Sequence, residues 1–289
     1  MRVFHKKLGG HALKPIPARF LAQLVLIALV ATSQPLDAHE FWIDAGPGRP
    51  VMGESVSADL RVGQDLSGAA LPYLDTTFRS MTHVSREGVE PLASRLGDRP
   101  AINDVTFGSN GLHILTVETH PAYIVFDTMP EFEAYLAYEG LTEIADRHRA
   151  RGLPDTGVAE EYLRNARALI QVGSIGNSDV DRPTGMPFEI VVDGTPFIAG
   201  KRTLTVRLTW QGAAAPHIQI ALFHLPSGGT APGDTTRTLV ETDGEGYAEF
   251  PMPGTGQYLL NAVRIEPADG PGSVVWQSHW ASVSFDIEP

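Results

Sequence analysis

The chain has 289 residues and no cysteine, and its 22 Lys and Arg against 34 Asp and Glu give a net charge of −12 at pH 7. Without cysteine, disulfides and thiolate metal sites are excluded, and stability must come from core packing. The acidic balance also excludes binding to nucleic-acid phosphates, which requires clustered Lys and Arg, so we expect no nucleic-acid partner.

Residues 1–38 have the order of a secretory signal. Basic residues precede an apolar run from Phe20 to Ala31, and a short polar stretch ends at Ala38. A helix that spans a bilayer needs about 20 apolar residues, so this shorter run favours a cleaved signal over an anchor. We expect cleavage after Ala38 and a soluble periplasmic or secreted chain. An uncleaved, membrane-tethered form is the alternative.

Cleavage after Ala38 would make His39 the first residue. A terminal α-amine and an imidazole both lose protons readily near neutral pH, and together they form a chelate ring on a divalent metal. Nitrogen donors of this kind favour Ni(II), Co(II), Cu(II) and Zn(II) over Mg(II) and Ca(II). One residue supplies only two donors, so a useful site needs at least one more ligand. The alternative is that His39 only marks the end of the signal.

The stretch from Phe41 to Asp127 is rich in predicted strands. Residues 55–62 alternate polar and apolar side chains, and residues 113–117 and 122–126 have the same character. The segment from Glu131 to Ala150 then predicts a helix interrupted at Gly140. The apolar residues between Tyr162 and Ile170 fall at helical spacing, and they predict a second helix that begins near Asp155 or Thr156.

From Lys201 onward the alternation returns. Residues 204–208, 218–222, 258–263 and 276–287 predict strands, and Asp243-Gly244 predicts a turn between two of them. The polar connector 177–184 is a plausible domain joint. We therefore predict a mainly β chain with two antiparallel β-sandwich-like domains. Residues 39–196 form the first domain with a helical insertion at about 131–172, and residues 197–289 form the second.

Several segments together resemble the exported proteins of the DUF4198 family. They are His39-Glu40-Phe41-Trp42-Ile43, Leu60 to Gln64, Phe132 to Leu136 with Glu139-Gly140-Leu141, Glu161 to Arg164 with Val172-Gly173, Thr242-Asp243, and Trp276 to Phe285. The resemblance implies a periplasmic component of nickel or cobalt uptake. It also implies a transthyretin-like or carboxypeptidase-regulatory-like C-terminal part. Only His39 is carried over as a functional residue, because His113, His120 and His279 depart from the family pattern.

Other residues are weaker candidates as metal ligands. Glu40 follows His39, but successive strand residues face opposite ways. His120 precedes Pro121 in a predicted strand break, from which a loop ligand could project. His279 shares the face of Ala281 and Val283, so a hydrogen-bonded core histidine competes with a ligand there. His224 at a strand exit is expected to be structural. Asn177, Asp179 and Asp181 lack the glycine and glutamate that a calcium loop requires.

Three functions are compatible with these residues. The first is a non-enzymatic periplasmic protein that binds nickel or cobalt, with copper or zinc as other candidates, and delivers the ion to a membrane importer. The second is a metal-independent envelope module that binds a polymer or a protein. The third is a copper oxidase of the histidine-brace kind, which would need His120 or His279 to complete the brace.

Overall fold

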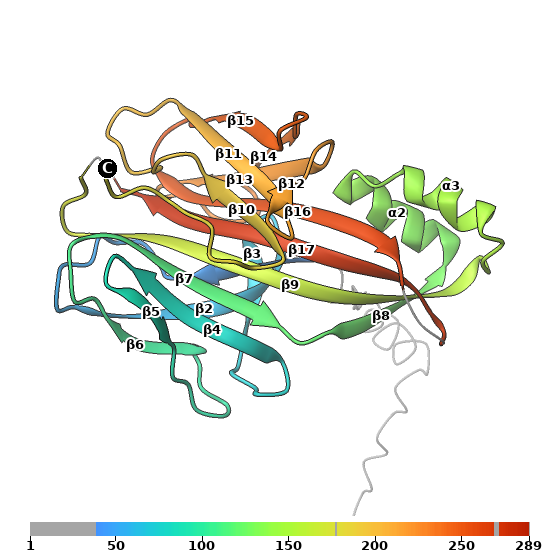
Figure 1. The fold of residues 1–289 in the computed structure, drawn as a ribbon, viewed down its shortest axis with the longest axis horizontal. Helices are drawn as coiled ribbons and strands as arrows, with labels where there is room; N and C mark the ends of the chain where they lie inside the picture. The colour runs from blue at the N-terminus through green and yellow to red at the C-terminus, as the bar shows by residue number, and fades with distance from the viewer. Residues whose placement is uncertain (1–38, 177, 269–271, 289) are drawn as a thin grey trace, which may run out of the picture. The chain divides into compact units, whose positions relative to one another are not determined.

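Three β-sheets and two helices make up the described residues of the computed structural model, 39–176, 178–268 and 272–288 (Figure 1). The predicted signal, residues 1–38, lies outside them. The predicted mainly β, sandwich-like fold is confirmed. No helix within the described ranges is long and apolar enough to cross a membrane.

The nine-stranded sheet contains strands from both ends of the chain. Its order is β14 (Thr236–Glu241), β13 (Gln219–Pro226), β16 (Gly256–Pro267), β17 (Val274–Ile287), β9 (Thr156–Val172), β7 (Gly111–Thr119), β4 (Phe78–Ser85) and β5 (Gly88–Pro91), and β8 (Ala122–Thr128) also pairs with β9. The β9–β17 pair is parallel, and the other pairs of this sheet are antiparallel. This pair joins strands from either side of the predicted domain boundary at residues 196 and 197. That boundary stays a prediction and lies in the loop before β11.

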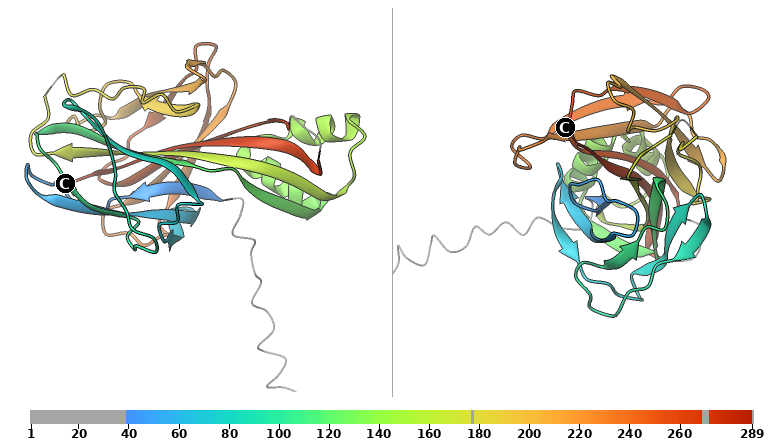
Figure 2. Two further views of the ribbon diagram at one scale, coloured as in Figure 1. Left: turned by 60° about the horizontal axis from the view of Figure 1, so that its bottom comes forward. Right: turned by 90° about the vertical axis from the view of Figure 1, so that its left-hand side faces the viewer.

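The two smaller sheets cover opposite faces of the large one (Figure 2). The first contains β1 (Glu40–Asp44), β2 (Ser55–Gln64), β3 (Ser67–Leu71) and β6 (Ile102–Thr106), and the second contains β10 (Phe188–Val192), β11 (Thr203–Trp210), β12 (Ala213–Ala214) and β15 (Tyr247–Pro251). On β7, Leu115 and Val117 pack toward the first sheet, whereas Leu112 and Ile114 pack toward the second. Alternate residues of a strand point to opposite faces, so the central strands are buried on both sides.

The helical segment begins at a well-formed cap. Helix α2 (Met129–Glu139) starts after Thr128, whose side chain accepts from the backbone N–H of Glu131 while the Glu131 carboxylate accepts from that of Thr128. Pro130 suits the first turn, since no intrahelical partner is needed there. Gly140 ends the helix at φ 75°, and α3 (Glu143–Ala150) follows. The helix predicted over 131–150 and its interruption at Gly140 are therefore confirmed.

The second predicted helix is wrong: residues 156–172 form β9, the longest strand of the sheet. Both faces of β9 are covered, so apolar residues occur at odd and even positions and the alternation disappears. The remaining pattern of Tyr162, Leu163, Ala166, Leu169 and Ile170 then imitates helical spacing. The helical part of the predicted insertion therefore ends at Ala150.

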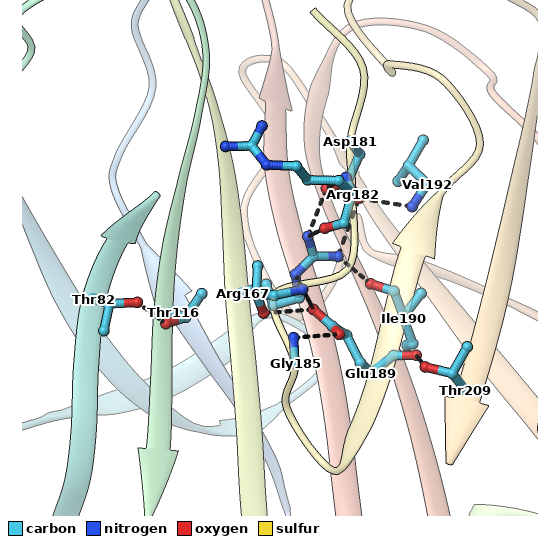
Figure 3. A network of polar contacts seen from close by, with 11 residues as sticks. Thr82, Thr116, Arg167, Asp181, Arg182, Gly185, Glu189, Ile190, Val192 and Thr209 are labelled. Carbon is cyan, nitrogen blue, oxygen red and sulfur yellow. Dashed lines mark hydrogen bonds and ion pairs between the residues drawn. The ribbon is translucent and has the colours of Figure 1, made fainter. Parts of the chain in front are cut away.

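A buried ion network ties β9 to the connector before β10 (Figure 3). The Arg167 guanidinium lies 2.6 Å from Asp181 and 3.2 Å from Glu189, and it also donates to the carbonyl of Ile190 at 2.5 Å. All three charged side chains are buried. Asp181 therefore has a structural role, in agreement with the reading of 177–184 as a connector rather than a calcium loop.

Candidate metal site at the start of the first strand

Strand β1 lies against β9 and β17, and hydrogen bonds to its backbone carbonyls hold it there. The hydroxyls of Ser282 and Ser284 donate to the carbonyls of Phe41 and Ile43 at 2.6 and 2.5 Å. At the start of the strand, the Arg164 guanidinium donates to the carbonyl of His39 at 3.1 Å. His39 is therefore anchored through its own carbonyl, and the next residue already belongs to the β1–β2 ladder.

Arg164 is held in place by aromatic rings. Its guanidinium carbon lies 4.6 Å from the centre of the Tyr162 ring and 5.9 Å from those of Phe41 and Trp280. Aromatic faces attract a desolvated guanidinium electrostatically. The Arg164 guanidinium, which donates to the His39 carbonyl, is therefore itself held in place by the folded core.

Glu40 is a buried carboxyl beside this anchor. Tyr138 OH on α2 donates to its Oε1 at 3.2 Å, whereas Oε2 has no hydrogen-bond partner within the described residues. Burial raises the pKa of Glu40 to about 7, and the nearby charge of Asp65 adds to this increase while Arg237 opposes it. Near neutral pH this carboxyl is thus easily converted between its protonated and charged forms.

Two further buried carboxyls lie on the same side of the large sheet. Glu139, at the end of α2, accepts from Asn261 at 3.4 Å, and Glu160 on β9 accepts from Tyr135 at 3.2 Å and from Ser278. Burial raises both pKa values, that of Glu160 to about 7. The charges of Glu40 and Glu160 raise the pKa of Glu139 further. We call Glu40, Glu139 and Glu160 the acidic cluster.

Each member of the acidic cluster has one buried oxygen that lacks a hydrogen-bond partner among the residues described here: Glu40 Oε2, Glu139 Oε1 and Glu160 Oε2. Arg237 and Arg164 are the cations that oppose them electrostatically. Sequence reasoning missed Glu139 and Glu160. Glu139 belongs to one of the segments that carry the family resemblance, but nothing in the sequence assigns it a function. Glu160 lies in the stretch that the sequence analysis wrongly predicts to be a helix.

The other predicted ligands lie elsewhere. His279 points to the face of β17 opposite to Ser282, where its ring centroid is 4.5 Å from that of Trp210 and its Nε2 lies 3.3 Å from Gln277 Oε1. His120 is exposed at the β7–β8 turn. Its backbone N–H donates to the carbonyl of Thr77 at 2.8 Å. In the described part of the chain, no three His, Cys, Asp or Glu side chains are placed to hold a metal ion.

The remaining candidate histidines have structural partners. His224 Nε2 contacts the carbonyl of Thr255 at 3.1 Å, as expected for a core histidine at a strand exit. His113 Nδ1 lies 2.7 Å from His83 Nε2, and its own Nε2 lies 2.9 Å from the carbonyl of Ser109. The sequence alone does not pair His113 with His83, because the two residues lie on different strands.

The fold and this region define a mainly β protein with an anchored histidine at its first strand and a buried acidic cluster nearby. The family described as "Domain of unknown function (DUF4198)" matches residues 36–266. The chain belongs to this family, in agreement with the resemblance found in its sequence.

Comparisons with individual proteins show more distant likenesses. Ribosomal RNA small subunit methyltransferase A from Shouchella clausii (strain KSM-K16) is 25% identical over 179 residues, which cover 58% of this chain and 59% of that protein. The chain thus spans about three fifths of this relative. Among solved structures, the chicken CNTN1 FN1-FN3 domains have a TM-score of 0.21 at 7% identity, covering 87% of this chain and 68% of that one. Dimeric latent PorU from Porphyromonas gingivalis has a TM-score of 0.18 at 10% identity, covering 90% and 21%.

Proposed function

We propose that the mature chain begins at His39 and captures a late transition metal ion through the α-amine and imidazole of that residue. Nickel or cobalt is the proposed cargo, with copper or zinc as competitors, and delivery to a membrane importer is the proposed purpose. The observation that carries the proposal is the anchoring of His39: Arg164 donates to its carbonyl at 3.1 Å, and β1 follows at once.

The anchoring favours binding because it reduces the entropy lost when a flexible terminus is ordered around an ion. Glu40 is the nearest carboxyl in sequence, and its Oε2, which has no hydrogen-bond partner among the described residues, is the candidate third donor. A ligand set supplied mainly by one residue leaves coordination positions open, which suits an ion that must be passed on.

The test compares two forms of the protein by calorimetric titration with Ni(II), Co(II), Cu(II) and Zn(II). One begins at His39, verified by mass spectrometry, and the other carries one extra alanine before it. We expect one-to-one binding that weakens at least roughly tenfold in the extended form, because the amine no longer closes the chelate ring. His217→Ala, which removes an exposed imidazole, is the control and should bind like the parent.

Three results would contradict the proposal. Equal affinity of both forms would show that His39 is only the end of the signal, and absence of binding would favour a metal-independent envelope module. A strong copper preference with turnover of a reductant would favour the oxidase. Glu40→Gln tests the third donor, and it should weaken binding while leaving the effect of the added alanine in place.

A further inference from the structure

A cavity of about 690 Å³ lies at the other end of β1. Its walls come from the loop after β1, the end of β9, the loop before β11, the β15–β16 loop and the end of β17. Pockets for small molecules usually have volumes of about 300–1,000 Å³. Strand β1 contributes Ile43 and Asp44 here, so about four residues, on the order of 13 Å, separate this cavity from His39.

One part of the lining is acidic. Asp44, Asp286 and Glu288 all line the cavity, and they lie close enough for the charges of Glu288 and Asp44 to raise the pKa of Asp286, after burial, to about 6. Asp44 is paired with Arg61 at 2.7 Å. Asp286 and Glu288 have no basic ion-pair partner within the ranges that the structure describes.

Another part of the lining is basic. Arg49, Lys201 and Arg202 project from two loops that border the cavity. The Lys201 ammonium donates to the carbonyl of Thr195 at 2.8 Å. Counting only described residues, none of these three cations has an ion-pair partner. Opposite charges therefore border one cavity without neutralising each other.

Gln171 adds a buried acceptor to this lining. Its side chain is only 8% exposed, and its amide donates to the carbonyl of Gly173 at 3.0 Å. Its Oε1 has no hydrogen-bond partner among the described residues. A buried acceptor without a donor is costly, so an N–H or O–H group from a ligand would stabilise this position. Phe197 and Phe285, in edge contact at 6.3 Å, supply apolar surface.

We propose that this cavity binds a small zwitterion of the size of a di- or tripeptide. The ligand ammonium lies by Asp286 and Glu288, the carboxylate lies by Lys201 and Arg202, and a peptide N–H donates to Gln171. A simple anion would be repelled by the acidic part and a simple cation by the basic part. A neutral ligand would leave both sets of charges unpaired, whereas a zwitterion satisfies both.

The probe is Ala-Ala-Ala, titrated into the protein that begins at His39 in the presence of EDTA so that no metal mediates binding. N-acetyl-Ala-Ala-Ala lacks the ammonium, and Ala-Ala-Ala amide lacks the carboxylate. We expect one-to-one binding of the free peptide and roughly tenfold or greater weakening for each blocked form. Asp286→Asn should weaken the free peptide but not its acetylated form, whereas Asp127→Asn on exposed β8 should change neither.

Lys201 gives a second readout, because it is the only lysine after Lys14. Acetylation with an N-hydroxysuccinimide ester, mapped by peptide mass spectrometry, should be slowed by Ala-Ala-Ala more at Lys201 than at the α-amine of His39, which reports any consumption of the ester by the peptide's own amine. Failure of the free peptide to bind, or equal binding of all three peptides, would overturn the proposal. Because an alanine added before His39 should leave peptide binding unchanged, failure here is distinct from failure of the metal proposal.

Discussion

His83 and His113 form a buried pair whose protonation can be deduced from its partners. The carbonyl of Ser109 only accepts, so the His113 Nε2 that lies 2.9 Å from it carries the proton. In the neutral ring, His113 Nδ1 is then the acceptor, and His83 Nε2 donates to it at 2.7 Å. A proton added to His113 Nδ1 would reverse this hydrogen bond and require His83 to change tautomer. Burial also disfavours the charged ring, so the pair is most stable while both rings are neutral.

This arrangement predicts that the histidine pair contributes less to stability in mild acid than at neutral pH. Burial lowers the pKa of both rings, and the neighbouring His113 lowers that of His83 further, while Glu87 and Glu90 partly oppose this. Arg86 lowers, and Asp179 raises, the pKa of His113. For these two rings the unfolded chain binds more protons than the folded one below a pH of about 6.5, so their contribution to the free energy of unfolding falls as pH decreases through the unfolded pKa. The raised pKa values of Glu40 and Glu160 act in the opposite direction.

The measurement is urea unfolding at several pH values between 7.5 and 5.5. His83→Gln should lower stability at pH 7.5, and this loss relative to the parent should shrink toward pH 5.5, because the contributions of Glu40 and Glu160 are the same in both proteins. The exposed His217→Gln is the matched control and should keep the parent slope. If the slope of the His83→Gln variant equals that of the parent, the pair does not titrate as described.

At the scale of single elements, the sequence predicted helix α2 correctly and misread strand β9. Helix α2 carries local signals at both ends, since Thr128, Pro130 and Glu131 form its first turn and Gly140 ends it. Strand β9 carries no such signal, because its pattern depends on sheets that cover it from both sides. The acidic cluster was missed for the same reason: Glu40, Glu139 and Glu160 meet only after β9 is a strand and α2 packs beside it.

The end of α2 gives a prediction for Gly140→Ala. Gly140 has φ 75°, and a Cβ there would lie 2.7 Å from the side chain of Gln219. Left-handed backbone costs an alanine about 1–2 kcal/mol, and the clash adds about 1–3 kcal/mol. Gly152→Ala is the matched control, because Gly152 has φ 66° with nothing within 4 Å of the added atom.

Urea unfolding at one pH should therefore show a larger loss for Gly140→Ala than for Gly152→Ala. The difference isolates the contact between the end of α2 and Gln219 on β13, since both variants carry the backbone strain. Equal losses would mean that Gln219 moves aside freely and that α2 is not tightly seated at this point.

At the scale of the whole molecule, the parallel β9–β17 pair decides whether the chain behaves as one cooperative unit. The two strands align from Val274 opposite Ala159 to Ser284 opposite Ala168. The β9 residues Leu169 and Ala166 contribute to the cores on opposite faces of the sheet. Separating residues 39–196 from 197–289 would split the core that holds Leu169, because Val206 and Leu260 belong to the same core, so we expect unfolding in a single transition.

Two core variants test this expectation. Leu115→Ala removes side-chain volume from the core under β1–β3, and Leu208→Ala removes it from the core under β10 and β11; each should cost about 2–5 kcal/mol. In a cooperative molecule, either variant shifts the whole transition, and far-UV circular dichroism and tryptophan fluorescence move together. The exposed Leu239→Ala should shift it little. Two separable domains would instead give two transitions, each moved by only one of the core variants.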